Sequence, residues 1–387
     1  MAPHDNSKLA ALADLGQSVW LDFISRDLLR SGRLGDRVAQ GVAGMTTNPT
    51  IFDKAIGQGD AYDEQIHELI DAGRATADIA DTLIATDVQD ACDLLRPVYD
   101  GTGHADGYVS IEVPPALAYD TRKTIAEAHR LHDMVDRPNL MVKIPGTQPG
   151  IAAIRQTVAD GLHINVTLLF ALDAYEQVVD AWFGGLEDRV ARREPIDDLR
   201  SVASFFVSRV DAKADHEIGE LVTDQNDPLV RSRLEGMRGT LALANAKLAY
   251  RRFLELSATD RWHRLAERGA HAQRVLWAST STKDPSYDDL LYVDNLIGPQ
   301  TVDTMPEETL AAFLDHGVVR RTVDRGADEA RDRVEQAAHL GIDLKAITGA
   351  LQVEGVSLFR DSFAGLLASV ERKRAELLTG EERKLSA

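Results

Sequence analysis

A single lysine lies inside an apolar run that extends from Leu140 to Ile144 and is followed by Pro145 and Gly146. This composition predicts a short buried strand that ends at a turn. Burial strips water from an ammonium group and favours the neutral amine, which can attack a carbonyl carbon and form a Schiff base. The alternative is that the side chain of Lys143 passes its apolar neighbours and carries its charged head out to water.

Other short apolar runs also contain polar residues at a spacing of two, and this spacing places them on one face of a strand. In nearly every run, the residues of the other parity are apolar. In a barrel, one face of each strand meets the surrounding helices and the other points to the axis, so these side chains would converge. The set comprises Asp22, Thr46, Asn48, Ser110, Glu112, Lys143, Asn165, Thr167, Ser204 and Phe206.

The chemistry open to such a set is narrow. A protonated imine on Lys143 is an electron sink, and it can stabilise the carbanion left when an adjacent C–C bond breaks. One carboxylate can take a hydroxyl proton while a second moves protons as the imine forms, and Asp22 and Glu112 suit this division. Amide side chains such as Asn48 and Asn165 can hold sugar hydroxyls without adding charge. We expect no metal and no cofactor, since the imine does the polarising.

Each residue also has a purely structural interpretation. Asp22 could cap a helix, Asn48 could be a turn residue before a proline, and the threonines could simply favour strands. Glu112 could pair with a surface base. Burying five such groups around one axis without a shared site would cost several kcal/mol for each unpaired group. One site explains all of them together.

Three residues just beyond the sixth and seventh predicted strands could bind a phosphate. Arg209 suits a bidentate contact, while Ser279 and Lys283 follow the seventh strand. The late loops of barrels often bind phosphate. The alternative for Arg209 and Lys283 is a solvated charge on a loop.

Eight short strands alternate with helical segments, which indicates a parallel sheet with helical crossovers. Eight units in this length fit a (β/α)8 TIM barrel. A doubly wound sheet is the competitor, but no G-x-G-x-x-G sequence follows the first strand. The expected strands are 18–24, 41–49, 107–114, 140–146, 163–170, 201–207, 274–280 and 301–305.

Additional helices are expected at two places. Residues 211–273 would hold one or two extra helices, with a strongly helical stretch at 233–256. A short helix is expected at 288–297, a single helix at 25–35, and a long amphipathic run near 356–378. The sequence shows no linker or repeat, so we predict one domain over residues 1–387, with a barrel core at 18–306 and a helical extension at 307–387.

Composition restricts the partners. The net charge of −19 argues against nucleic acid and anionic membrane surfaces. No apolar stretch is long enough to span a membrane, and Met1 to Lys8 does not resemble a signal peptide. Cys92 is the only cysteine and is expected to be a buried thiol, which favours a cytoplasmic location. The sequence leaves the oligomeric state open, as monomer or homodimer.

The chain closely resembles the transaldolase family, in its longer bacterial form. The similarity runs in family order from residue 20 to about residue 305. One departure concerns the loop after Ser279, where shorter members carry an arginine and this chain has Lys283. The resembling segments are 20–22, 44–49, 109–113, 142–145 with Gly150 and Ile151, 165–170, 204–209 and 276–280.

This resemblance implies that Lys143 forms the Schiff base, that Asp22 is the base at the C4 hydroxyl, and that Glu112 acts through a water near Thr167. It further implies that the dihydroxyacetone unit is held by Asn48, Asn165 and Ser204, and the phosphate by Arg209 and Ser279. The implied reaction moves that unit from sedoheptulose 7-phosphate to glyceraldehyde 3-phosphate, in the non-oxidative pentose phosphate pathway. The products would be erythrose 4-phosphate and fructose 6-phosphate. A fructose 6-phosphate aldolase or an inactive sugar-phosphate-binding barrel are the alternatives.

Overall fold

The structure is a computed structural model that describes residues 7–385. Its strands are β1 Gln17–Leu21, β2 Val42–Met45, β3 Tyr108–Glu112, β4 Leu140–Pro145, β5 Ile164–Leu169, β6 Ser201–Phe206, β7 Arg274–Ala278 and β8 Thr301–Met305. They form a closed parallel barrel in chain order, and β8 pairs back with β1. The predicted (β/α)8 barrel is confirmed, and the doubly wound sheet is wrong.

Helices surround this barrel on the outside. Those before β6 are α1 Lys8–Asp14, α2 Arg26–Arg30, α3 Arg33–Gln40, α4 Pro49–Gly57, α5 Asp63–Asp71, α6 Thr76–Gly101, η1 Pro115–Leu117, α7 Thr121–Val135, α8 Gln148–Asp160 and α9 Leu172–Ala191. Those after β6 are α10 Ser208–Asp224, α11 Pro228–Glu235, α12 Leu241–Ser257 and α13 Asp260–Ala266. The C-terminal helices are α14 Glu307–His316, α15 Ala327–His339 and α16 Leu344–Leu385. The additional helices expected after the sixth strand and at the C-terminus are therefore present.

The helical predictions need four corrections. The stretch at 25–35 is two helices, because Gly32 adopts a φ of +84° between α2 and α3. The helical stretch at 233–256 is interrupted between α11 and α12, where Gly239 has a φ of +67°, and the region 211–273 holds more helices than the expected one or two. Residues 288–297 form turns instead of a short helix.

The register of the barrel aligns the polar residues. Glu112 on β3 pairs with Lys143 on β4, and Lys143 pairs with Asn165 on β5. Residues paired side by side in a sheet point to the same face, so all three side chains turn toward the axis. The strands β4, β5 and β6 are buried along their whole length, as strands between a helical layer and a filled interior must be.

The end of the barrel where the strands begin is plugged. Trp20 is fully buried, and its Nε1 donates to Asp106 at 3.0 Å. Asp106 also pairs with Arg274, at 2.9 Å. Gly44 makes room for the plug, because a Cβ atom there would lie 2.6 Å from the Trp20 ring. The plug places the open end of the barrel at the C-terminal ends of the strands.

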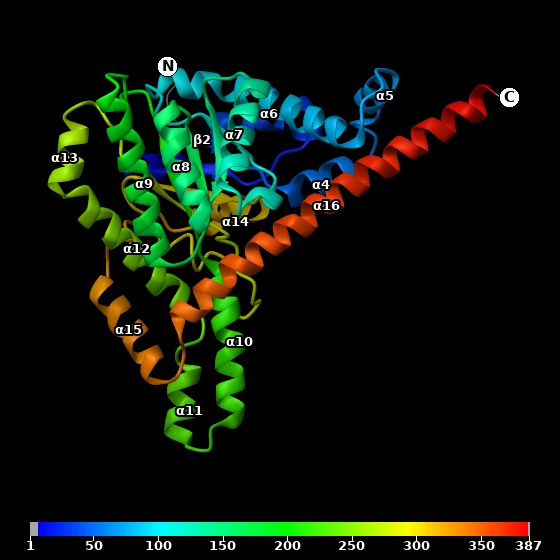
Figure 1. Ribbon diagram of the computed structural model, residues 1–387. Coiled ribbons are helices and arrows are strands. Elements are labelled where there is room, and N and C mark those ends of the chain that lie inside the picture. The colour runs from blue at the N-terminus through cyan, green and yellow to red at the C-terminus, as the bar shows by residue number, and fades with distance from the viewer. Residues whose placement is uncertain (1–6, 386–387) are drawn as a thin grey trace.

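Helix α16 crosses the molecule diagonally beside α4, and its C-terminal end extends past α5 (Figure 1). It also contacts α10, η1 and β5, so it reaches the rim of the barrel. Its buried side chains recur at helical spacing, as the predicted amphipathic run requires. They include Val356, Phe359, Leu366 and Val370.

No helix within residues 7–385 is long and apolar enough to cross a membrane. The prediction that the N-terminus lacks a signal peptide concerns residues 1–8, of which 1–6 lie outside the described residues. Cys92 is fully buried on α6, as expected, and burial raises the pKa of its thiol.

Candidate active site

Lys143 lies inside the barrel, where only 4% of the residue is exposed. Its Nζ donates to the backbone oxygen of Thr47 at 3.2 Å and lies 3.4 Å from Oε2 of Glu112. The ring centroid of Phe359, on α16, is 5.9 Å from the same nitrogen. The alternative in which this side chain carries its head to water is wrong.

Glu112 is a buried acid beside the lysine. Burial raises the pKa of its carboxyl to about 7, although the positive charge of Lys143 acts in the opposite direction. Neither carboxylate oxygen has a hydrogen bond within the described residues, and the buried hydroxyl of Thr167 also has none there. A carboxyl that titrates near neutral pH can both give and take protons.

Asp22 follows β1 at the open end of the barrel. Its Oδ1 accepts a hydrogen bond from Thr46 at 2.7 Å, and Thr46 Oγ1 lies 2.6 Å from Thr304 Oγ1. Burial raises the pKa of Asp22, against the opposing positive charges of Lys143 and others. The helix cap of α2 is Ser25 and not Asp22, so the capping alternative for this aspartate is wrong.

The two predicted amides have different surroundings. Asn165 is fully buried, donates to Ser110 Oγ at 3.0 Å and accepts from Ser204 Oγ at 2.7 Å. Asn48 instead caps α4, since its side-chain oxygen accepts from the backbone nitrogen of Ile51 at 3.1 Å. Asn48 is therefore a helix cap and not a turn residue, and its location at the start of α4 keeps it near Thr47, whose carbonyl accepts a hydrogen bond from Lys143.

Two cations lie toward the rim: Arg209 in the first turn of α10, which follows β6, and Lys283 on the loop that follows β7. Burial lowers the pKa of Arg209, and the charge of Asp22 opposes this. Lys283 keeps solvent exposure, but partial desolvation, followed by the charge of Arg209, lowers its pKa, while Asp22 raises it. Within the described residues neither cation is part of an ion pair. An anion placed between them would meet two uncommitted positive charges.

The two cations and the serines near them also make contacts with neighbouring side chains. The guanidinium of Arg209 lies over the ring of Phe206, with 5.6 Å from its carbon to the centroid. Ser279 has a φ of +57°, and its hydroxyl lies 2.9 Å from that of Ser208. Lys283 donates to Ser281 Oγ at 2.8 Å.

Sequence reasoning missed several residues that complete the site. Ser110 was placed on the inward face but given no role, and Thr304 on the eighth strand was not considered, although both are polar strand residues. Phe359 had no such signal, because nothing local in a long helix tells which strand end it will meet. No sequence pattern indicated that the backbone carbonyl of Thr47 accepts a hydrogen bond from Lys143.

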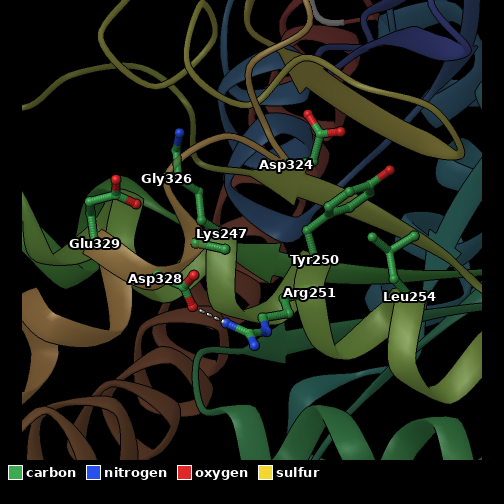
Figure 2. Close-up of a pocket in the computed structure, with 9 residues that line it drawn as sticks. Lys247, Tyr250, Arg251, Leu254, Asp324, Gly326, Asp328 and Glu329 are labelled. Atoms are coloured by element: carbon green, nitrogen blue, oxygen red, sulfur yellow. Dashed lines mark hydrogen bonds and ion pairs between the residues drawn. The ribbon is translucent and has the colours of Figure 1, made fainter.

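Two pockets lie away from this site. A pocket of about 320 Å³ lies outside the barrel between α12 and α15. Figure 2 shows Arg251 paired with Asp328 there, and Lys247 donates to the carbonyls of Thr322 and Arg325. A second pocket of about 220 Å³, lined in part by Arg274, lies at the plugged end. Neither contains a predicted catalytic residue, and within residues 7–385 no cluster of His, Cys, Asp or Glu suits a metal ion.

Comparison with known proteins agrees with this geometry. The family model described as "Transaldolase/Fructose-6-phosphate aldolase" matches residues 19–370. The chain is 47% identical over 367 residues to a protein named transaldolase from Parafrankia sp. (strain EAN1pec), covering 94% of this chain and 97% of the relative. It is 45% identical to transaldolase 2 of Streptomyces coelicolor (95% and 98% covered) and 44% identical to transaldolase of Thermobifida fusca (95% and 99%). The chain therefore belongs to the transaldolase/fructose-6-phosphate aldolase family.

Proposed function

We propose that this protein is a transaldolase, a transferase that uses Lys143 as a Schiff-base nucleophile. The observation that carries the proposal is the contact between Lys143 Nζ and Glu112 Oε2 at 3.4 Å inside a closed barrel. The reaction transfers a dihydroxyacetone unit from sedoheptulose 7-phosphate to glyceraldehyde 3-phosphate. Its products are erythrose 4-phosphate and fructose 6-phosphate, as in the non-oxidative pentose phosphate pathway.

Imine formation falls to Lys143 and Glu112. The amine attacks the ketose carbonyl, and the resulting carbinolamine loses its hydroxyl as water. Glu112 moves the protons in these steps, which its pKa of about 7 and its position beside the amine both support. Thr167, whose hydroxyl is buried and without a hydrogen bond in the described residues, would hold the departing water.

Cleavage of the C–C bond falls to Asp22. It takes the proton of the C4 hydroxyl, so that the bond between C3 and C4 breaks and its electrons move into the imine. A raised pKa makes this carboxylate a stronger base, and the hydrogen bond from Thr46 fixes its orientation.

The remaining predicted residues bind the substrate. We assign the hydroxyls of the dihydroxyacetone unit to the polar group around Asn165, whose own hydrogen bonds fix its orientation. We assign the phosphate to the rim, where two cations have no ion pair within the described residues. The full substrate-binding set is Thr46, Asn48, Asn165, Ser204, Phe206, Arg209, Ser279 and Lys283.

Borohydride trapping tests the nucleophile. Incubation with fructose 6-phosphate and borohydride should leave a stable adduct on Lys143, detected by peptide mass spectrometry. Lys143→Ala should lose the adduct and lower the transfer rate by far more than roughly tenfold, which is a barrier change of about 1.4 kcal/mol. A circular dichroism spectrum and a melting temperature that match the parent show that the fold is kept. An adduct on another lysine, or a surviving rate within tenfold of the parent, would refute the assignment.

The family description also includes an aldolase, which would release free dihydroxyacetone. The relatives compared above are named transaldolase, and this chain aligns with nearly their whole length, which favours transfer. Turnover that needs no aldehyde acceptor would favour the lyase, and a missing adduct would favour a binding protein. We further propose a cytoplasmic location, which the single, buried Cys92 supports.

A further inference from the structure

One side chain from the C-terminal helix enters the site. Phe359 is 5% exposed, and its ring centroid lies 5.9 Å from Nζ of Lys143. More than 200 residues separate the two in the chain. The face of an aromatic ring attracts a cation at this distance and offers no hydrogen bond to water. The Lys143 nitrogen therefore has an acid on one side, Glu112, and an apolar ring on another.

The helix is fixed to the rim on the N-terminal side of this phenylalanine. Nε2 of Gln352 donates to the carbonyls of Gly146 at 3.0 Å and Leu168 at 3.3 Å, which lie at the ends of β4 and β5. Gly355 lets the helix come close, because a Cβ atom there would be 2.9 Å from Cδ2 of Leu168. Leu168 itself has a φ of +58°, where the pairing of β5 with β6 becomes irregular.

The helix is also fixed on the C-terminal side of Phe359, where it lies beside α4. Thr50 donates to Ser362 at 2.8 Å, and Ser369 donates to Asp53 at 2.8 Å. Because α16 is attached on both sides, the backbone of Phe359 is held in place beside the amine.

We propose that Phe359 is a specificity-determining residue, whose ring keeps water away from the enamine on Lys143 so that the bound three-carbon unit passes to an aldehyde before it is protonated. The inference rests on the proposed transaldolase function. After the first aldehyde leaves, the three-carbon unit remains attached to Lys143 as an enamine. Its fate then depends on whether an aldehyde or a proton reaches its nucleophilic carbon first.

Two outcomes compete at this stage. In transfer, the enamine carbon attacks the carbonyl carbon of an aldehyde, a new C–C bond forms, and the resulting alkoxide takes a proton. Water then adds to the iminium carbon, the C–N bond breaks, and the new ketose leaves Lys143. In hydrolysis, that carbon takes a proton, and water adds to the iminium carbon. The C–N bond then breaks, so one water is consumed and free dihydroxyacetone and the lysine amine are released. Both paths end when water adds to an iminium carbon, so they differ only in whether an aldehyde or a proton from water reaches the enamine carbon first. An apolar ring beside the nitrogen limits the water next to the enamine and therefore slows its protonation.

The experiment compares Phe359→Ala with Leu358→Ala. Leu358 is the adjacent residue of the same helix and is 53% exposed, so it controls for shortening a large side chain in α16. Fructose 6-phosphate is supplied alone, and free dihydroxyacetone is measured. It is then supplied with erythrose 4-phosphate, and sedoheptulose 7-phosphate is measured. Phe359→Ala should raise the ratio of hydrolysis to transfer roughly tenfold or more, whereas Leu358→Ala should stay within about twofold of the parent.

A second variant covers the case in which Phe359→Ala does not fold. Phe359→Leu keeps apolar volume over the nitrogen, and it should give a ratio between those of the parent and the alanine variant. An unchanged ratio in a folded Phe359→Ala protein, or an equal change in Leu358→Ala, would overturn the inference. Failure of the proposed function is separate, because the unmodified protein would then form no borohydride adduct and no sedoheptulose 7-phosphate.

Discussion

At the scale of single residues, the amine of Lys143 and the carboxyl of Glu112 form a close, buried pair. The two side chains are 6% and 3% exposed and 3.4 Å apart. Little water reaches either group, so a charge on one group is stabilised mainly by an opposite charge on the other. This arrangement suits a reaction in which the nitrogen must be neutral to attack and positive once it is an imine.

Glu112 should give imine formation a characteristic pH dependence. The pKa of its carboxyl is raised to about 7, so the proton-accepting form appears as the pH rises through that value. The rate of imine formation should therefore increase from pH ~6 to pH ~8. Glu112→Gln should lower this rate on the order of 100-fold and remove the inflection. Rapid-quench borohydride trapping measures the rate, and a Gln variant that keeps the inflection would assign it to another group.

Arg209 should act on the phosphate. Removing its charge leaves the imine chemistry in place but weakens binding of the phosphorylated end. We expect Arg209→Ala to raise KM for fructose 6-phosphate by roughly tenfold or more, and to leave KM for fructose nearly unchanged. Lys283→Ala should show the same selectivity with a smaller effect, because Lys283 is exposed. Steady-state kinetics with both donors decide the matter, and equal changes for the two sugars would argue against a phosphate role.

At the scale of elements, the strands could be predicted from the sequence and the helix ends only in part. Alternation along each strand separates the residues that face the axis from those that face the helices, and this pattern is local. The break between α11 and α12 is not local, because Gly239 leaves the helical conformation beside Tyr287, which is far along the chain. The contact of Phe359 with Lys143 was hidden for the same reason.

Gly239 should resist substitution more than a glycine that also has a positive φ but faces open space. Its φ is +67°, and a Cβ atom would lie 2.8 Å from the ring of Tyr287. Gly341, with a φ of +90°, has nothing within 4 Å of such an atom and is the matched control. Gly341→Ala should cost about 1 kcal/mol of unfolding free energy from backbone strain, and Gly239→Ala should cost roughly 1–3 kcal/mol more. Chemical denaturation measures both, and equal losses would show that the tyrosine moves aside freely.

At the scale of the whole molecule, one buried carboxyl makes stability depend on pH. Asp303 on β8 is fully buried and accepts a hydrogen bond from Thr280 at 3.0 Å, and burial raises its pKa to about 7. Between its ordinary pKa and this value, the folded protein keeps a proton that the unfolded chain releases. The contribution of Asp303 to unfolding free energy is therefore fully present below about pH 4 and declines as the pH rises to about 7.

Asp303→Asn should remove this dependence, because the amide resembles the protonated acid. Relative to the parent, the variant should gain stability as the pH rises from about 4 to about 7, by at most about 1.4 kcal/mol per pH unit. Asp133→Asn, whose carboxyl is 81% exposed, is the control and should show no comparable trend. Denaturation midpoints across this pH range provide the measurement. A difference that stays constant with pH would mean that Asp303 titrates alike in the folded and unfolded chains.

The barrel and the convergence of its polar residues could be predicted from the sequence, because both follow from strand parity and the alternation of strands with helices. The hydrogen bond of Asn48 to its own helix shows the limit of such reasoning, since one residue type can cap a helix and still lie near a site. The prediction that residues 1–387 form one domain stays a prediction.

The plug made by Trp20, Asp106 and Arg274 has a kinetic consequence. Because that end of the barrel is plugged, both sugars must enter through the open end, at the C-terminal ends of the strands. The first aldehyde therefore has to leave before the second can bind. Initial velocities plotted against the concentration of one sugar, at several fixed concentrations of the other, should then give parallel double-reciprocal lines. An excess of one sugar should inhibit the reaction, because it occupies the open end through which the other must enter.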